Sequence, residues 1–233
     1  MEKEIWRSKK IKKEDSGSHW LSISDLMSGL MIVFLFIAIS YMYNIHKIAQ
    51  DYKVTKEKIY EALYEEFKDD LKKKTWGASI DPKTLTITFN APNVQFDRNK
   101  ADLKKEYQNV LADFFPRYMT VLSKFKDVIQ EIRIEGHTSS IWNTRSTPEE
   151  AYFKNMKLSQ DRTRSVLYYV FNLPQVVKYR NWMKKKIAAV GFSSAHVIFD
   201  KNGKENYSTS RRVSFRILTN AEGSIEKILK DGR

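Results

Sequence analysis

The chain has 233 residues, a net charge of +13 and no cysteine, which excludes disulfides, thiolate metal sites and thiol nucleophiles. Its length suits a membrane anchor plus one domain of ordinary size, and 42% hydrophobic residues are enough for a folded core. The basic charge permits an acidic polymer, an anionic lipid surface or nucleic acid as partner. We expect no direct nucleic-acid contact, because the lysines are scattered and no recognition-helix or glycine-rich signature occurs.

The sequence also lacks the patterns of catalytic sites. Its four histidines show no metal-ligand spacing, and no acid pair or nucleophile elbow stands out. We therefore predict that the protein is not an enzyme and carries no cofactor or metal. His137, in a Gly-His-Thr turn, is expected to be structural.

Residues 20–45 form the most apolar segment and follow a polar segment, residues 1–19, expected to be a cytoplasmic tail. The 20 residues at 26–45 carry no charge, and as a helix they would span about 30 Å, the hydrocarbon thickness of a bilayer. A cleavable signal peptide is the alternative, but the run is long for one and no small-residue cleavage site follows it. The sequence predicts a retained transmembrane helix over residues 20–45. Six Lys/Arg before it against four soon after favour a cytoplasmic N-terminus.

Asp25 lies near the start of this apolar segment. A carboxylate inside a membrane costs roughly 2.5–3.5 kcal/mol on insertion scales and marks a functional-site hypothesis. Acidic residues also favour helix N-termini, so a cap at the headgroup level is the second interpretation. Composition alone leaves both open.

Residues 24–31, SDLMSGLM, followed by VFLF at 33–36, resemble the transmembrane helix of MotB-type stator subunits. The segment looks most like the B subunits of Zorya anti-phage defence systems. In the MotB family an aspartate followed by a hydrophobic residue and a methionine opens the helix and carries the translocated ion. The resemblance implies that Asp25 carries H⁺ or Na⁺, and that the chain is a single-pass inner-membrane protein with its C-terminal domain in the periplasm.

The resemblance also implies partners. These are a second copy of the chain and a multi-span MotA-like A subunit, arranged as a B homodimer within an A pentamer. Two alternatives stay open: a flagellar-type or other stator B subunit, and a plain envelope tether without ion transport. The choice between H⁺ and Na⁺ also stays open, because it depends on the A subunit.

Residues 46–77 are predicted to form a helical linker. Apolar residues recur from Ile45 to Leu71 at spacings of three, four and seven, with no glycine or proline before Gly77. The opposite face is charged, so the apolar stripe needs cover from a second copy or from the domain that follows; a membrane-surface helix is the alternative. Because MotB-like subunits are dimeric and helical at this place, the resemblance favours self-association.

Residues 78–219 alternate strands with helices, which predicts an α/β sandwich with the helices on one face of a mixed sheet. Residues 147–150, Thr-Pro-Glu-Glu, have the N-cap, first-position proline and acidic first turn of a helix. Pro116 is expected to kink or split an earlier helix. Strands are predicted at residues 84–89, 132–136, 187–192 and 212–217, helices at 101–126, 147–170 and 174–186, a break at 91–93 and a C-terminal tail at 220–233.

This domain resembles the OmpA-like peptidoglycan-binding family over roughly residues 84–217. The family's Gly-His-Thr-Asp pattern corresponds to residues 136–139, and its Asn-x-x-Leu-Ser-x-x-Arg pattern corresponds to residues 155–162. Residues 94–97 match the family's entry into the first helix, and residues 211–212 match its paired arginines. The peptidoglycan-binding residues that the resemblance implies are Thr138, Ser139, Asn155, Leu158, Arg162 and Arg211.

The residue types suit this ligand. Peptidoglycan stems carry free carboxylates, which an arginine guanidinium binds bidentately, and the turn at residues 136–138 offers backbone N–H groups and a hydroxyl. The alternative is that Arg162 pairs with Asp161 or Glu135, and that Asn155 caps a helix.

Ser139 departs from the family pattern, in which an aspartate meets the ammonium group of the ligand. A hydroxyl can accept a hydrogen bond from an ammonium group but cannot neutralise its charge. Candidates for compensating contacts are Trp142 and Arg145, in an insertion after residue 140, and residues 174–186.

Overall fold

The computed structural model describes residues 16–72, 76–90 and 95–220, with side chains at Trp20 and from Ile23 onward in the first range. Residues 1–15 of the expected N-terminal tail, the break at 91–93, the family match at Val94 and the tail from 221 lie outside the described residues. The chain divides after Ile48 into two compact units, which are described separately. The expected linker therefore belongs to the second unit from residue 49 onward.

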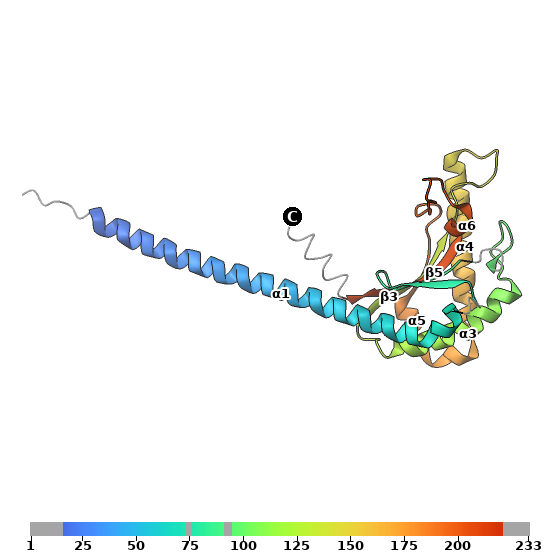
Figure 1. The fold of residues 1–233 in the computed structure, drawn as a ribbon, viewed down its shortest axis with the longest axis horizontal. Coiled ribbons are helices and arrows are strands. Elements are labelled where there is room, and N and C mark those ends of the chain that lie inside the picture. Colours follow the sequence, from blue (N-terminus) through green and yellow to red (C-terminus); the bar gives the residue numbers. More distant parts are fainter. Residues whose placement is uncertain (1–15, 73–75, 91–94, 221–233) are drawn as a thin grey trace, which may run out of the picture. The chain divides into compact units, whose positions relative to one another are not determined.

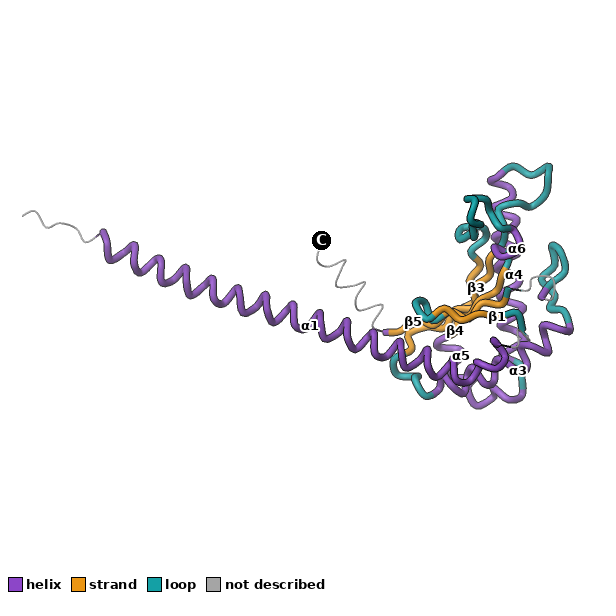
Figure 2. The backbone as a smooth tube through the Cα atoms, viewed as in Figure 1, coloured by secondary structure: helices purple, strands orange, loops and turns teal. Residues whose placement is uncertain are grey.

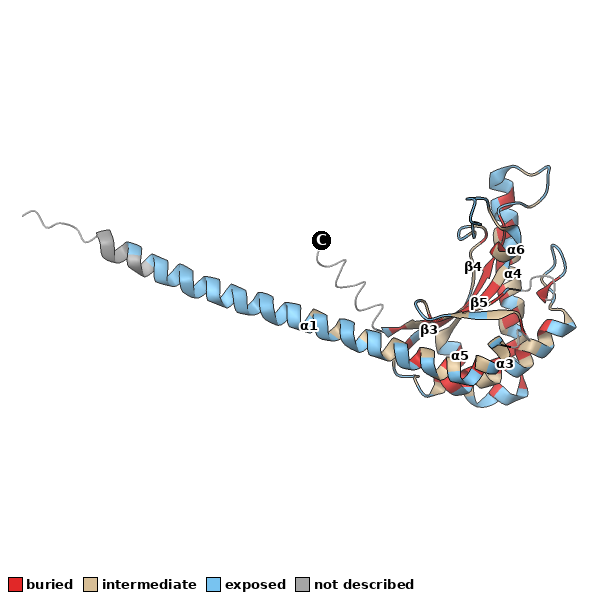
Figure 3. Cartoon of the chain, in the orientation of Figure 1, coloured by how far each residue is buried: buried red, intermediate tan, exposed pale blue. Residues whose placement is uncertain are grey.

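The first unit contains the apolar part of helix α1 (Ser16–Lys72). From Ile23 onward this helix includes a window of mean hydropathy 2.1, none of which is buried in the described chain, as Figure 3 shows. It is long and apolar enough to cross a membrane.

The second unit is built on a five-stranded mixed sheet (Figure 1). The strand order is β1-β2-β5-β3-β4, and β3 pairs with β4 in parallel while the other pairs are antiparallel. The strands are β1 (Ala78–Asp81), β2 (Thr86–Phe89), β3 (Ile129–His137), β4 (Ile187–Gly191) and β5 (Arg212–Thr219). Strand β1 was not predicted; it is a short edge strand whose Ala-Ser-Ile-Asp sequence has a single β-branched residue.

Helices cover one face of this sheet, which confirms the predicted fold class (Figure 2). They are α3 (Lys105–Ser123), α4 (Pro148–Phe171), α5 (Arg180–Lys186) and a 3₁₀ helix η1 (Pro174–Tyr179); the short α6 (Tyr207–Ser210) directly precedes β5. Thr147 caps α4 as predicted, its side chain accepting the Glu150 N–H at 3.2 Å. Pro116 lies inside α3 without splitting it.

The last turns of α1 pack into the core of the second unit. Ile59, Leu63 and Phe67, at spacings of four, have exposed fractions of 0%, 0% and 1%. The Phe67 ring lies 5.8 Å from the Trp76 ring and 5.2 Å from the Phe114 ring. The expectation that a second copy covers the stripe is therefore wrong for these residues, because the domain that follows covers them.

Arg117 of α3 fixes this end of α1. Its Nε donates to the Glu66 carboxylate at 2.7 Å, and its Nη2 lies 3.1 Å from the Asp70 carboxylate. Its guanidinium carbon stacks 4.9 Å from the centre of the Phe67 ring. The two carboxylates and the aromatic ring that contact Arg117 all belong to α1, so these contacts hold the end of α1 against α3.

Candidate functional site

A cavity of about 350 Å³ lies where β3 ends and β5 begins, beside α4. All six residues predicted from the sequence line it: Thr138, Ser139, Asn155, Leu158, Arg162 and Arg211. The other lining residues are Phe96, Asp97, Arg98, Asn99, Ile141, Trp142 and Tyr207. Trp142 was a candidate for a compensating contact, whereas Arg145 and residues 174–186 do not line the cavity.

Two glycines let α4 approach the sheet closely enough to form the cavity wall. Gly136 and Gly191 are register partners on β3 and β4. A Cβ atom on Gly136 would lie 2.7 Å from the backbone oxygen of Ser159, and one on Gly191 would lie 2.5 Å from the backbone nitrogen of Gln160. The helix therefore rests directly on the two strands at this point, and the absence of these two side chains sets the position of α4.

Asn155 holds the turn that follows β3. Its side chain is 3% exposed, and its Nδ2 donates to the backbone oxygen of Ser139 at 3.1 Å. On the other side of the turn, the Thr138 N–H donates to the backbone oxygen of Ser193 at 2.9 Å. Asn155 is not a helix cap, because α4 begins at Pro148. Its amide fixes the shape of the cavity from inside the helix.

Arg162 is held by backbone oxygens and an aromatic ring. Its Nε donates to Lys100 O at 2.9 Å, its Nη2 donates to Asp97 O at 3.1 Å, and its guanidinium carbon lies 4.7 Å from the Phe96 ring centre. A guanidinium has five N–H groups, and three of those of Arg162 make no hydrogen bond to the described residues. The side chain is therefore positioned without losing its capacity to bind an anion.

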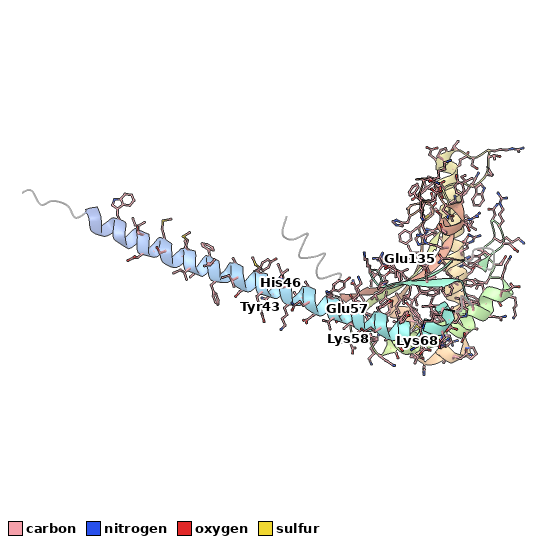
Figure 4. All side chains as sticks on the ribbon, viewed as in Figure 1. Tyr43, His46, Glu57, Lys58, Lys68 and Glu135 are labelled. Carbon is pink, nitrogen blue, oxygen red and sulfur yellow. The ribbon has the colours of Figure 1, made fainter. Side chains whose placement is uncertain are left out.

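The alternative ion pairs of Arg162 do not form in the described part of the chain. Asp161 pairs with Lys157 at 2.7 Å. Glu135 lies against His137, with its carboxylate 3.6 Å from Nε2, and it borders a different cavity, on the other face of the sheet. Glu135 is labelled in Figure 4.

The cavity has a surplus of positive charge. Burial and the neighbouring Arg211 lower the pKa of Arg162 to about 10, so the guanidinium is still charged at neutral pH. Arg98 also lines the cavity. Lys104 and Lys100 hold the pKa of the Asp97 carboxyl below its usual range, which leaves that carboxylate neutralised by its own partners. An anion in the cavity would relieve the repulsion between the arginines.

Glu205 ties a distant loop to the turn after β3. Its carboxylate accepts the Ser140 N–H at 2.9 Å and also the Ser140 hydroxyl. Two residues later, Tyr207 lines the cavity. Sequence reasoning missed this contact because its partners are 65 positions apart, and neither belongs to a recognisable pattern.

Asp25 lies inside α1 and not at its beginning. The helix begins at Ser16 and has no acidic residue in its first turn, so the N-cap interpretation does not fit. Asp25 is exposed in the single chain. Side chains farther along α1, such as Tyr43 and His46, likewise project from the helix in Figure 4.

Comparisons with known proteins agree with this architecture. The OmpA family model matches residues 95–211. The chain is 47% identical to the Zorya protein ZorB of Escherichia coli (Crooks strain), covering 94% of this chain and 96% of that protein. It is 24% identical to a second Zorya protein ZorB, from Escherichia coli O139:H28, covering 85% and 79%.

Among solved structures, the crystal structure of a putative MotB-like protein from Desulfovibrio vulgaris shares the fold. It superposes with a TM-score of 0.52 at 19% identity, covering 73% of this chain and 98% of that one. At 47% identity over nearly its whole length, the chain belongs to the ZorB family of Zorya proteins, with an OmpA-family domain at its C-terminal side.

Proposed function

We propose that this chain, a stator B-like subunit of a Zorya system, works in an ion-driven motor of the inner membrane that protects the cell against phage. Asp25 carries the translocated H⁺ or Na⁺, and the second unit anchors the complex to peptidoglycan from the periplasm. The partners are a second copy of the chain and a pentamer of the multi-span A subunit, ZorA.

One observation carries the wall-anchoring part. Three separate segments bring the six predicted residues to one cavity, and that cavity is positively charged. A carboxylate of a peptidoglycan stem would receive paired hydrogen bonds from the three remaining N–H groups of Arg162, with Arg211 beside it. The Asn155 amide holds the turn after β3, which also lines the cavity, in place.

The ion-carrying part is supported by the position of Asp25 within an apolar helix. A carboxylate there must be bound by a partner or neutralised, because the surrounding hydrocarbon does not solvate charge. In a ring of A subunits, Asp25 would take up an ion from one side and release it to the other. Anchoring the second unit to the wall turns that ion flux into rotation of one part against a fixed other.

The wall-binding part is tested by sedimenting the full chain, in detergent, with purified peptidoglycan. Arg162→Ala should lower binding at least tenfold, because it removes the anion clamp and its contact with Phe96. The matched control is Arg164→Ala, on the same helix, whose side chain is 81% exposed and pairs only weakly with Asp161 at 3.9 Å. Equal binding by a folded Arg162→Ala protein and its control would refute the clamp.

A further inference from the structure

The charges around the cavity favour one class of ligand. Its charged lining residues are Arg98, Arg162 and Arg211 on the positive side and Asp97 on the negative side. The Asp97 carboxylate is already bound by Lys104 at 3.1 Å and Lys100 at 3.8 Å. None of the described lining residues therefore offers a carboxylate without a cation on it, and the sequence of residues 91–94 contains no acid either.

The other side chains that line the cavity are uncharged. They carry hydroxyl, amide, aromatic and aliphatic groups and include Ser139, Asn155 and Trp142. Ser139 is 6% exposed, and the Nδ2 of Asn155 donates to the Ser139 backbone oxygen. Among the described lining residues, a positively charged group on a ligand would meet only neutral partners beside Asp97, namely hydroxyl oxygens, amide oxygens and ring faces, and three guanidinium groups would repel it.

We propose that the cavity recognises a carboxylate and does not require a free amino group beside it. This inference rests on the proposed peptidoglycan function. A diaminopimelate stem carries a carboxylate and an amine on the same side chain, and a cross-link acylates that amine, which removes its charge and leaves the carboxylate. The cavity therefore binds cross-linked stems as well as stems with free amines, which suits an anchor that holds mature wall.

Glu205 is the acidic residue that could supply an ammonium partner instead. It lies beside the Ser139 turn, but it does not line the cavity. Each of its carboxylate oxygens accepts a hydrogen bond from Ser140, one from the N–H and one from the hydroxyl. These hydrogen bonds make Glu205 a link between two loops. The Glu205→Gln variant tests whether its carboxylate also binds an ammonium group of the ligand.

Three synthetic tripeptides test the inference by calorimetry on the full chain in detergent. Each has the sequence L-Ala-γ-D-Glu-diaminopimelate: the first is unmodified, the second has its side-chain amine acetylated, and the third has its side-chain carboxylate amidated. We expect acetylation to change the Kd less than threefold and amidation to raise it at least tenfold. Ser139→Asp should create a preference of about tenfold for the unmodified peptide over the acetylated one.

If acetylation of the peptide raises the Kd of the wild-type protein tenfold or more, the inference is overturned, but the proposed binding of peptidoglycan stands. If that loss disappears in Glu205→Gln, the ammonium partner is Glu205. Equal affinities for the amidated and unmodified peptides would also overturn it, because the carboxylate would then not be recognised. If none of the three peptides binds, the proposed peptidoglycan function fails and the inference falls with it.

Discussion

Replacing Gly136 with alanine tests the link between the sheet and the cavity. The added Cβ would lie 2.7 Å from Ser159 O and 2.8 Å from Thr163 Cγ2. Because a backbone oxygen cannot rotate away, α4 must move off the strand. Overpacking of this kind costs about 1–3 kcal/mol. In a unit of this size, each kcal/mol lowers Tm by about 2–4 °C, so we expect a fall of about 2–12 °C.

The displacement should also affect the site, since α4 carries Asn155 and Arg162. We expect peptidoglycan sedimentation by Gly136→Ala to weaken even at temperatures where the protein is fully folded. Thermal unfolding of the full chain in detergent measures the first effect. Gly29→Ala is the control, because nothing lies within 4 Å of its added Cβ in the single chain. An unchanged Tm together with unchanged sedimentation for Gly136→Ala would refute the close contact between α4 and β3.

Two further predictions follow from buried groups. Cysteine at Ile59 should cross-link two copies no better than cysteine at the exposed Lys58, because Ile59 lies in the core of its own unit. For the same reason, Ile59→Ala should lower the free energy of unfolding of that unit by about 2–5 kcal/mol. Efficient cross-linking at Ile59 alone would contradict this packing. Burial lowers the pKa of His137 below its ordinary value of 6.5, so the unfolded chain binds the proton more readily, and stability present above about pH 6.5 should be lost as the pH falls below it. Thermal unfolding at pH 7 and pH 5 measures the loss, and an equal loss in His137→Gln would assign it to other groups.

Short motifs that resemble the OmpA-like family predicted most of the site. The Gly-His-Thr turn and the Asn155 to Arg162 spacing are short-range features, and the predicted cap at Thr147 fixes where α4 starts. Once α4 is a helix lying on β3, its inward face must meet the turn after that strand. This explains why five of the six predicted residues come together; Arg211 joins them only because β5 pairs with β3 in the sheet.

The rest depends on contacts between distant segments. The apolar stripe of α1 predicts that one face of the helix is buried, but its periodicity does not tell whether a second copy or the chain's own core covers that face. The contact between Phe67 and Phe114 is a tertiary contact that only the structure shows. In the same way, the Ser140 contact with Glu205 brings Tyr207 to the cavity across 65 positions.

The central claim, that Asp25 carries an ion, is tested most directly by one conservative change. Asn has nearly the same shape as Asp but can neither release a proton nor bind a cation with its charge. In membrane vesicles containing the chain and its A subunit, Asp25→Asn should leave assembly intact and abolish ion flux, while the neighbouring Ser24→Ala should retain it. Full flux through the Asp25→Asn complex would contradict the account, because a neutral amide cannot carry the ion.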